Sequence, residues 1–469
     1  MTSSSRDAAL AHLERHFDDH LDALRALVRI GGVSAEPPPN PTLAKSAAAV
    51  VAQMQAAGLE RCRVIEVPDA HPYAYGEWLG APGAPTLLLY GHHDVQPVGR
   101  LDRWETPPFE PTPRADGRLY GRGAVDDKAG VMAHVAACAA WLRGPGALPV
   151  NVKLIVEGEE EIGSGHLEAF LQAHRELLQA DCIVLTDTAN LDEGVPALTV
   201  SLRGIVAVTV EVRAIERPLH SGMWGGPVPD ATLGLCRALG APVDADGQVA
   251  APLRAGVRPP DDAARARLEA IPFDEARFRA DAGLLPGVEL VGDASMPVYG
   301  RLWREPALSV VALEARPFKG STNQIVESAR ARVSVRTVPD QDAAEVEAAL
   351  VALLRENVPW GLELRVTPEA SARWWSTVPD GPAFDAAARA MAAGYGREGF
   401  YIGCGGTIPF VEPFANAFGG VPALLTGVED PRCAAHAENE SLSVQDFQSA
   451  ARTAVHLYAE LATALDHRA

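Results

Sequence analysis

Two histidines and three acidic residues stand out because their side chains are typical ligands of divalent metal ions. They are His92, Asp126, Glu161, Asp187 and His436. Imidazole nitrogens and carboxylate oxygens form the ligand set of zinc and related ions. A carboxylate can also bridge two ions with its two oxygens, and a pair of ions about 3.5–4 Å apart activates water for hydrolysis. Together the five residues predict a two-metal hydrolytic site.

The first motif, His92-His93-Asp94, combines a histidine with a carboxylate two residues further on. This spacing suits a metal ligand, His92, that an acidic partner, Asp94, holds in place. It is also typical of a turn histidine that is hydrogen-bonded to a neighbouring aspartate. We expect His93 to be structural, because successive residues of an extended chain point to opposite sides.

The second and third motifs are rich in carboxylates. Asp126 and Asp127 follow a glycine-rich turn and precede a helical segment, where an aspartate can act as a helix cap. One cap does not need two acids, so one of them can instead bridge two cations. The run 157–161 contains four glutamates, and its alternative is a solvated acidic loop. A nearby dication would turn the repulsion in this run into attraction.

The remaining candidates depend on their neighbours. Asp187 ends an apolar segment and is alternatively a cap, and His436 lies in a polar loop where a histidine is usually structural. If Glu161 is a ligand, the adjacent Glu160 is the candidate general base. Only the combination of all five motifs indicates metal binding.

Three short apolar segments are expected to be the buried strands that position these residues: 86–90, 152–156 and 182–186. Helical segments at 128–143 and 166–178 lie between them. Each strand leads directly into one of the polar motifs, and ligands of α/β sheets bind at the carboxyl ends of the strands. The pattern predicts an α/β fold with a central mixed, mostly parallel sheet that is flanked by helices.

From residue 204 the pattern changes to alternating strands, at 205–212 and 331–336, with a helix at 341–356. We interpret residues 204–372 as a second, α+β domain. It is inserted into a first domain that residues 1–203 and 373–469 form.

Composition excludes several classes of function. The 469 residues carry a net charge of −20, which repels phosphate backbones and anionic lipid, so we expect neither a nucleic-acid nor a membrane partner. No segment approaches the roughly 20 apolar residues of a membrane helix, and the first residues do not resemble a signal peptide. Six scattered cysteines without a C-x-x-C pair predict a cytoplasmic location.

The motifs resemble a known family when they are taken together and in order. They are 90–97 (YGHHDVQP), 121–128 (GRGAVDDK), 157–164 (EGEEEIGS), 219–222 (LHSG) with Gly225-Gly226, and His436 with Asn439-Glu440. The chain resembles the co-catalytic zinc metallopeptidases, which include carnosinases, bacterial dipeptidases, aminoacylase, carboxypeptidase G and succinyl-diaminopimelate desuccinylase. The similarity is greatest to the carnosinase-like dipeptidase branch.

The resemblance implies a role for each residue of the predicted site. His92 and Asp187 bind one metal ion, Glu161 and His436 bind the other, and Asp126 bridges both. Asp94 orients His92. Glu160 takes a proton from a metal-bridging water, and the resulting hydroxide attacks the amide. The resemblance also implies a cis peptide bond between Asp126 and Asp127.

The resemblance further implies that the inserted domain is a lid and dimerisation domain that contributes to the site. His220 polarises the scissile carbonyl across the dimer, although a turn histidine beside glycines is the alternative. Arg336, with Asn323, binds the terminal carboxylate of the substrate. The loop of Gly405, Gly406 and Thr407 offers backbone N–H groups to the same carboxylate. Gly403-Cys404 precedes this loop, where the carnosinase branch often has Arg-Glu.

These expectations combine into one hypothesis. The chain is a homodimeric, cytoplasmic metallohydrolase with two divalent ions per subunit, and it cleaves the amide bond of dipeptides. Zinc is the expected metal, and manganese or cobalt could replace it. The alternatives are a deacylase of N-acyl amino acids, with the same hydrolytic machinery, and a catalytically inactive relative that binds peptides.

Overall fold

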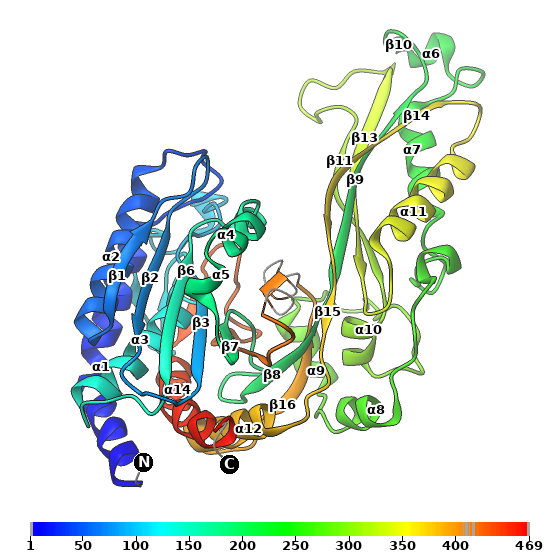
Figure 1. Cartoon of the computed structure of the whole chain (residues 1–469). Helices are drawn as coiled ribbons and strands as arrows, with labels where there is room; N and C mark the ends of the chain where they lie inside the picture. The colour runs from blue at the N-terminus through cyan, green and yellow to red at the C-terminus, as the bar shows by residue number, and fades with distance from the viewer. Residues whose placement is uncertain (1–2, 407, 409–410, 412, 415–417, 467–469) are drawn as a thin grey trace. The chain divides into compact units, whose positions relative to one another are not determined.

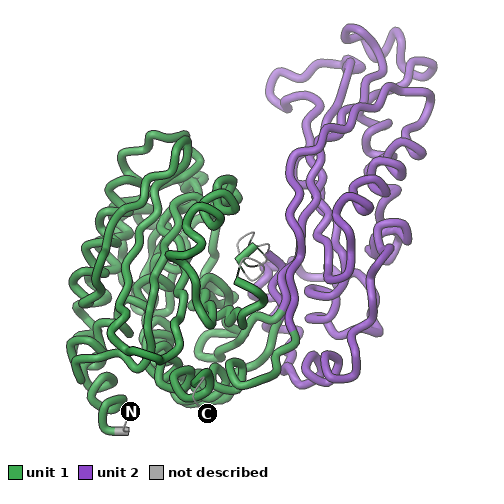
Figure 2. Tube along the Cα trace, viewed as in Figure 1, with its two compact units in different colours: residues 1–200, 378–402, 408–469 green, residues 201–377, 403–407 purple. Residues whose placement is uncertain are grey.

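The computed structural model of the chain describes residues 3–406, 408, 411, 413–414 and 418–466. The chain divides into two compact units (Figure 2). The first contains Met1–Val200, Val378–Ile402 and Ile408–Ala469, and the second contains Ser201–Thr377 and Gly403–Thr407. No described helix has both the length and the apolar composition that a membrane-crossing helix requires.

The first unit is built on a mixed sheet whose central strands are parallel (Figure 1). The strands follow the order β1 (Glu60–Ile65), β2 (Tyr73–Trp78), β6 (Asn151–Glu157), β3 (Thr86–His92), β7 (Cys182–Thr186), β17 (Ala423–Thr426) and β8 (Ala197–Leu202). β15 (Trp375–Ser376) and β16 (Phe400–Cys404) both pair with β8. The four strands from β6 to β17 run parallel, and β1, β2 and β8 run antiparallel to their neighbours.

Helices cover this sheet and close its core. They are α1 (Ser3–Ile30), α2 (Pro41–Ala57), α3 (Lys128–Arg143), α4 (Leu167–Ala173), α5 (Arg175–Leu178), α12 (Pro382–Tyr395) and α14 (Val444–Ala464). α3 is buried along nearly its whole length and packs against α1, α2 and α14. Ser443 caps α14 by accepting a hydrogen bond from the Asp446 N–H at 3.2 Å. A small sheet of β4 (Thr112–Pro113), β5 (Arg118–Tyr120) and β18 (Ser441–Ser443) completes the unit.

The second unit is built on a four-stranded antiparallel sheet. Its strands follow the order β11 (Ala307–Glu314), β13 (Ser328–Thr337), β9 (Gly204–Arg213) and β14 (Glu363–Ala372). Alternate valines of β9 are buried against α7 (Ala231–Gly240) and α11 (Ala343–Asn357). The remaining elements are β10 (Leu219–His220), α6 (Ser221–Trp224), α8 (Asp262–Glu269), α9 (Glu275–Asp281), α10 (Val298–Arg304) and β12 (Gln324–Ile325).

The predicted α/β class and the three predicted strands are confirmed. Leucines 87–89 are fully buried because both faces of β3 are covered, which explains the continuous apolar run. One expected helix differs. Segment 166–178 forms two short helices because the backbone leaves the helical range at His174, where φ is −113° and ψ is 18°.

Candidate metal centre

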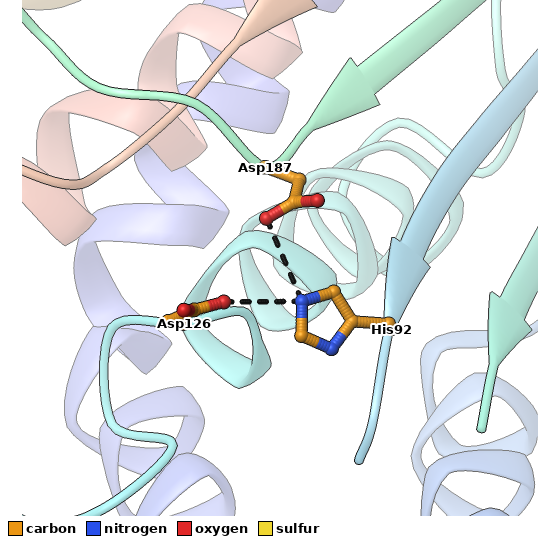
Figure 3. A group of neighbouring side chains, drawn as sticks. All are labelled: His92, Asp126 and Asp187. Atoms are coloured by element: carbon orange, nitrogen blue, oxygen red, sulfur yellow. Dashed lines mark hydrogen bonds and ion pairs between the residues drawn. The ribbon is translucent and has the colours of Figure 1, made fainter. Parts of the chain in front are cut away.

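The carboxyl end of the parallel strands gathers the first ligand group, His92, Asp126 and Asp187 (Figure 3). His92 is the last residue of β3, and Asp187 directly follows the neighbouring strand β7. His92 Nε2 lies 3.1 Å from Asp126 Oδ1 and 3.5 Å from Asp187 Oδ1. The ligand atoms of the group lie within 4.8 Å of one another, which is close enough for a single ion to reach all three.

A second group shares Asp126 with the first and adds Glu161 and His436. His436 Nε2 lies 2.9 Å from Asp126 Oδ2 and 3.1 Å from Glu161 Oε2. The two oxygens of Asp126 therefore face different groups, as a bridging carboxylate requires. Its peptide bond to Asp127 is cis, as the resemblance implied.

The pKa values of the two histidines are raised by the negative charge of the carboxylates in these groups. Burial alone lowers the pKa of His92, but the carboxylates of Asp187 and Asp126 raise it well above the usual range. Hydrogen bonds to Asp126 and Glu161 raise the pKa of His436 to about 11. Neutral imidazole is the form that binds a metal. The same carboxylates that hold these protons can hold dications in their place, so the donor set fits two divalent ions.

Asp94 contacts three parts of the site. Its backbone carbonyl lies 3.1 Å from His92 Nδ1, and its own Oδ1 lies 3.4 Å from that nitrogen. Its carboxylate also accepts the backbone N–H groups of Glu160 at 3.2 Å and of Glu161 at 3.0 Å. Asp94 is fully buried. It therefore links the ring of His92 to the loop that carries the two glutamates.

Glu160 lies at the start of a short 3₁₀ turn, Glu160–Ile162, that follows β6. Burial raises the pKa of Glu160 well above its usual range, and the charge of Asp187 adds to this effect. A carboxylate with a raised pKa accepts and returns a proton near neutral pH, which suits a general base.

Several supporting residues were not assigned a role by sequence reasoning. Gln96 donates its side-chain and backbone N–H groups to Glu161, at 2.8 and 3.1 Å. Asp127 does not cap α3 with its side chain but accepts the His92 backbone N–H at 3.1 Å. A Cβ on Gly91 would lie only 2.5 Å from Asp127 Oδ2, so glycine is required for this approach.

Glu440 holds the glycine-rich loop that leads into Asp126. Its buried carboxylate accepts the N–H groups of Gly123 at 3.0 Å and Val125 at 3.1 Å, and it pairs with Arg122 at 2.6 Å. Its only sequence signal is its place in the motif that contains His436. An acid that accepts backbone N–H groups is recognised only from the folded loop.

The second unit contains the other predicted residues. His220 is exposed, and its Nδ1 accepts the Gly222 N–H at 3.1 Å. The exposed Asn323 lies beside it, since its carbonyl accepts the Ser221 N–H at 2.9 Å. The structure thus brings His220 and Asn323 together within this unit.

Arg336 lies on β13, and burial lowers its pKa. The buried Arg203 is close enough to Arg336 for the two charges to interact, and its Nε donates to the Gly405 carbonyl at 3.2 Å. Gly406 donates its N–H to Cys404 Sγ at 3.3 Å. Thr407 lies outside the described residues. Arg203 was not predicted to be a site residue. Only its position beside Arg336 and the Gly405 carbonyl in the folded protein indicates a role.

Comparisons with known proteins agree with the geometry of the centre. A sequence profile of Peptidase family M20/M25/M40 matches residues 88–460. A "cysteinylglycine-S-conjugate dipeptidase" of Corynebacterium striatum is 33% identical over 86% of this chain and 86% of its own. Human "Beta-Ala-His dipeptidase" is 28% identical over 96% of this chain and 92% of its own.

Structural similarity extends over the whole length. The crystal structure of human carnosine dipeptidase 1 matches with a TM-score of 0.86 and 27% identity. It covers 98% of this chain, and the match includes 99% of that chain. The resemblance predicted from the motifs is thereby confirmed, and the chain belongs to Peptidase family M20/M25/M40.

Proposed function

We propose that this chain is a metallodipeptidase that holds two divalent metal ions and cleaves the amide bond of dipeptides. The observation that carries the proposal is the position of Asp126, whose two oxygens face His92 and His436 at 3.1 and 2.9 Å. The dipeptidase names of the two relatives support the substrate class. Zinc is the metal we propose, because the nitrogen and oxygen donors suit it.

Within this proposal each of the five ligand residues is assigned to one or both ions. His92 and Asp187 hold one ion, Glu161 and His436 hold the other, and Asp126 is shared. When bound, such a pair supplies Lewis acidity and lowers the pKa of water at the site toward neutrality. Asp94 holds Glu161 in position relative to His92 by accepting hydrogen bonds from the backbone N–H groups of Glu160 and Glu161.

Glu160 is proposed as the general base. Its carboxylate takes a proton from the attacking water while the water oxygen bonds to the amide carbon. It then delivers that proton to the leaving nitrogen as the C–N bond breaks, so the products are an amine and a carboxylic acid.

The second unit is proposed to bind the far end of the substrate. The guanidinium groups of Arg336 and Arg203, whose charges interact, suit a terminal carboxylate, which arginine binds bidentately. Gly405 and Gly406 are proposed to donate backbone N–H groups to the same carboxylate. His220 is proposed to polarise the scissile carbonyl from the partner subunit of a homodimer, and Asn323 is proposed to help Arg336 bind the terminal carboxylate.

Two features support the proposed homodimer and its compartment. β11 is the edge strand of the second sheet, and it exposes Val310, Val311 and Leu313, with Val311 57% exposed. An apolar strand edge of this kind is suited to pair with another chain. All six cysteines are free thiols, which supports a cytoplasmic location.

The test combines metal analysis of purified protein with a panel of substrates. We expect about two equivalents of metal per chain and hydrolysis of dipeptides in preference to N-acetyl and N-succinyl amino acids. Preference for the acylated substrates would instead identify a deacylase. Bound metal without any turnover would identify an inactive peptide-binding protein.

A further inference from the structure

The second unit contains a cavity of about 350 Å³ to which no residue of the candidate metal centre contributes. Its walls come from helix α10, from the segments 243–254 and 290–293, and from the first residues of β11. All of these segments belong to the same compact unit. The volume is at the lower end of the roughly 300–1,000 Å³ of small-molecule sites, so the cavity suits a group no larger than a side chain or a small ligand.

Most of the residues that line the cavity are apolar. They include Val249, Phe278, Leu290, Val298, Leu302 and Leu308. Sites for small molecules typically combine such a lining with a few polar groups that fix the orientation of the ligand. The lining therefore favours a ligand with an apolar part.

Charged side chains in the wall are held by neighbouring groups. Arg254 donates to Gln248 Oε1 at 2.7 Å and pairs with Glu305 at 2.9 Å. Arg301 donates to the Val291 carbonyl at 2.9 Å. Because these contacts lie within the wall itself, an entering group meets mainly apolar surface.

Arg203 connects the cavity to the glycine loop. It is a buried residue that lines the cavity, and its Nε donates to the Gly405 carbonyl at 3.2 Å. The chain that leads into this loop also packs on α10, since a Cβ on Gly403 would lie only 2.6 Å from Trp303 Cβ. The loop that is proposed to bind the substrate carboxylate therefore lies against the wall of the cavity.

Arg336 begins beside the same wall. It is paired directly with Ala307 in the antiparallel ladder of β13 and β11, and Ala307 lines the cavity. Side chains of directly paired residues leave the same face of a sheet, with Cβ atoms about 5 Å apart. Of the two arginines that are proposed to hold the terminal carboxylate, one thus lines the cavity and the other starts next to it.

The covalent structure of an amino acid limits where its side chain can lie. The side chain and the α-carboxylate are attached to the same Cα atom, so a carboxylate that is held by Arg203 and Arg336 brings the side chain of the same residue close to them. The apolar cavity adjoins both arginines. It is therefore in position to receive that side chain.

We propose that this cavity binds the side chain of the C-terminal residue of the substrate, and that the protein prefers dipeptides whose C-terminal residue is large and apolar. The inference rests on the proposed function, to which it adds a side-chain preference. A phenylalanine side chain would bury its ring against the apolar lining, which removes about 150–250 Å² of surface from water. A C-terminal glycine has no side chain to bury there.

The test compares kcat/KM of the zinc-loaded protein for alanyl-phenylalanine and alanyl-glycine, which differ only in the C-terminal side chain. We expect wild-type protein to favour alanyl-phenylalanine about 10- to 100-fold, the effect of burying an aromatic side chain. Leu302→Trp fills the cavity from a position that is 37% exposed. It should lower the ratio of the two kcat/KM values about 10-fold, because the new ring occupies the space of the substrate ring.

Leu285→Trp is the matched control. Leu285 is 72% exposed and does not line the cavity, so this substitution adds the same side chain to the same unit outside the cavity. It should leave both kcat/KM values unchanged. Val298→Phe, at another lining position, is a second filling variant and should lower the ratio in the same direction. Thermal denaturation identifies the variants that are folded.

Three results would overturn the inference. They are equal kcat/KM of wild-type protein for the two dipeptides, an unchanged ratio in a folded filling variant, and an equal fall of the ratio in Leu285→Trp. The dipeptidase function is judged separately, from whether any dipeptide is hydrolysed. If only N-acyl amino acids are hydrolysed, that function is refuted, and the ratio for N-acetylphenylalanine and N-acetylglycine still decides the role of the cavity. If nothing is hydrolysed, calorimetry with the two dipeptides decides it.

Discussion

Asp94 shows how one buried side chain can set the geometry of an entire centre. Its carboxylate accepts two backbone N–H groups, of Glu160 and Glu161, and it also faces His92. Asp94→Asn replaces one acceptor oxygen with an NH₂ donor, which repels one of those N–H groups. We expect zinc affinity, measured by chelator competition, to fall about 10- to 100-fold. The exposed Asp102→Asn is the control, and an unchanged zinc affinity of Asp94→Asn would argue against this role.

Glu160 should affect the chemistry and not the metal. It belongs to neither ligand group, so Glu160→Gln should keep the zinc content of the wild-type protein. Loss of the proton acceptor should lower kcat about 10²- to 10⁴-fold. Metal analysis and steady-state kinetics on the same sample check both halves. A variant with near-normal kcat would refute the assignment of the base.

The residue types of the site could be predicted from the sequence, but the supporting contacts could not. Histidines and acids at strand ends are recognisable as metal ligands because few other functions require these residue types at the ends of successive strands. Gln96 acts by donating N–H groups to the Glu161 carboxylate, whereas Glu440 acts by accepting backbone N–H groups of the glycine-rich loop. Those N–H groups come from segments that are distant in the sequence.

At the scale of elements, His134 joins α3 to the sheet and to α14. The buried ring lies between Tyr458 Oη at 3.1 Å and Thr186 Oγ1 at 2.7 Å. Burial lowers its pKa to about 3. The unfolded chain therefore binds a proton near pH 6.5 that the folded protein does not bind. The resulting stability is complete above pH 6.5 and is lost as the pH falls toward 3.

His134→Gln should remove this part of the pH dependence. Between pH 7.5 and 5 the wild-type protein should lose about 2 kcal/mol more stability than the variant. Urea unfolding of both metal-free proteins at the two pH values gives the comparison, and other titrating groups cancel in the difference. Parallel losses in the two proteins would show that His134 does not contribute.

Elements were easiest to predict where burial is uniform. The apolar runs of β3 and β7 and the helix 128–143 match the structure because each is covered on all sides. The interruption at His174 was not predictable, since the residues around it have ordinary helical propensity. Helices α8 and α9 bury none of their residues, so the sequence indicates only surface helix and loop there.

At the scale of the whole molecule, the proposed dimer makes a prediction that no single chain can satisfy. If each site uses His220 from the partner subunit, neither His220→Ala nor Glu160→Gln homodimers are active. A mixed dimer would combine the intact Glu160 of one subunit with the intact His220 of the other. Random pairing of equal amounts should then restore about a quarter of the wild-type sites, as expected for a two-fold dimer.

The measurement is turnover by mixed dimers that are isolated through two different affinity tags. Isolated mixed dimers should have about half of the wild-type activity, because one of their two sites is complete. If His220 acted within its own subunit, each site of the mixed dimer would lack one of the two groups. Activity no higher than that of the parent homodimers would therefore exclude shared sites, and the exposed position of His220 would need another explanation.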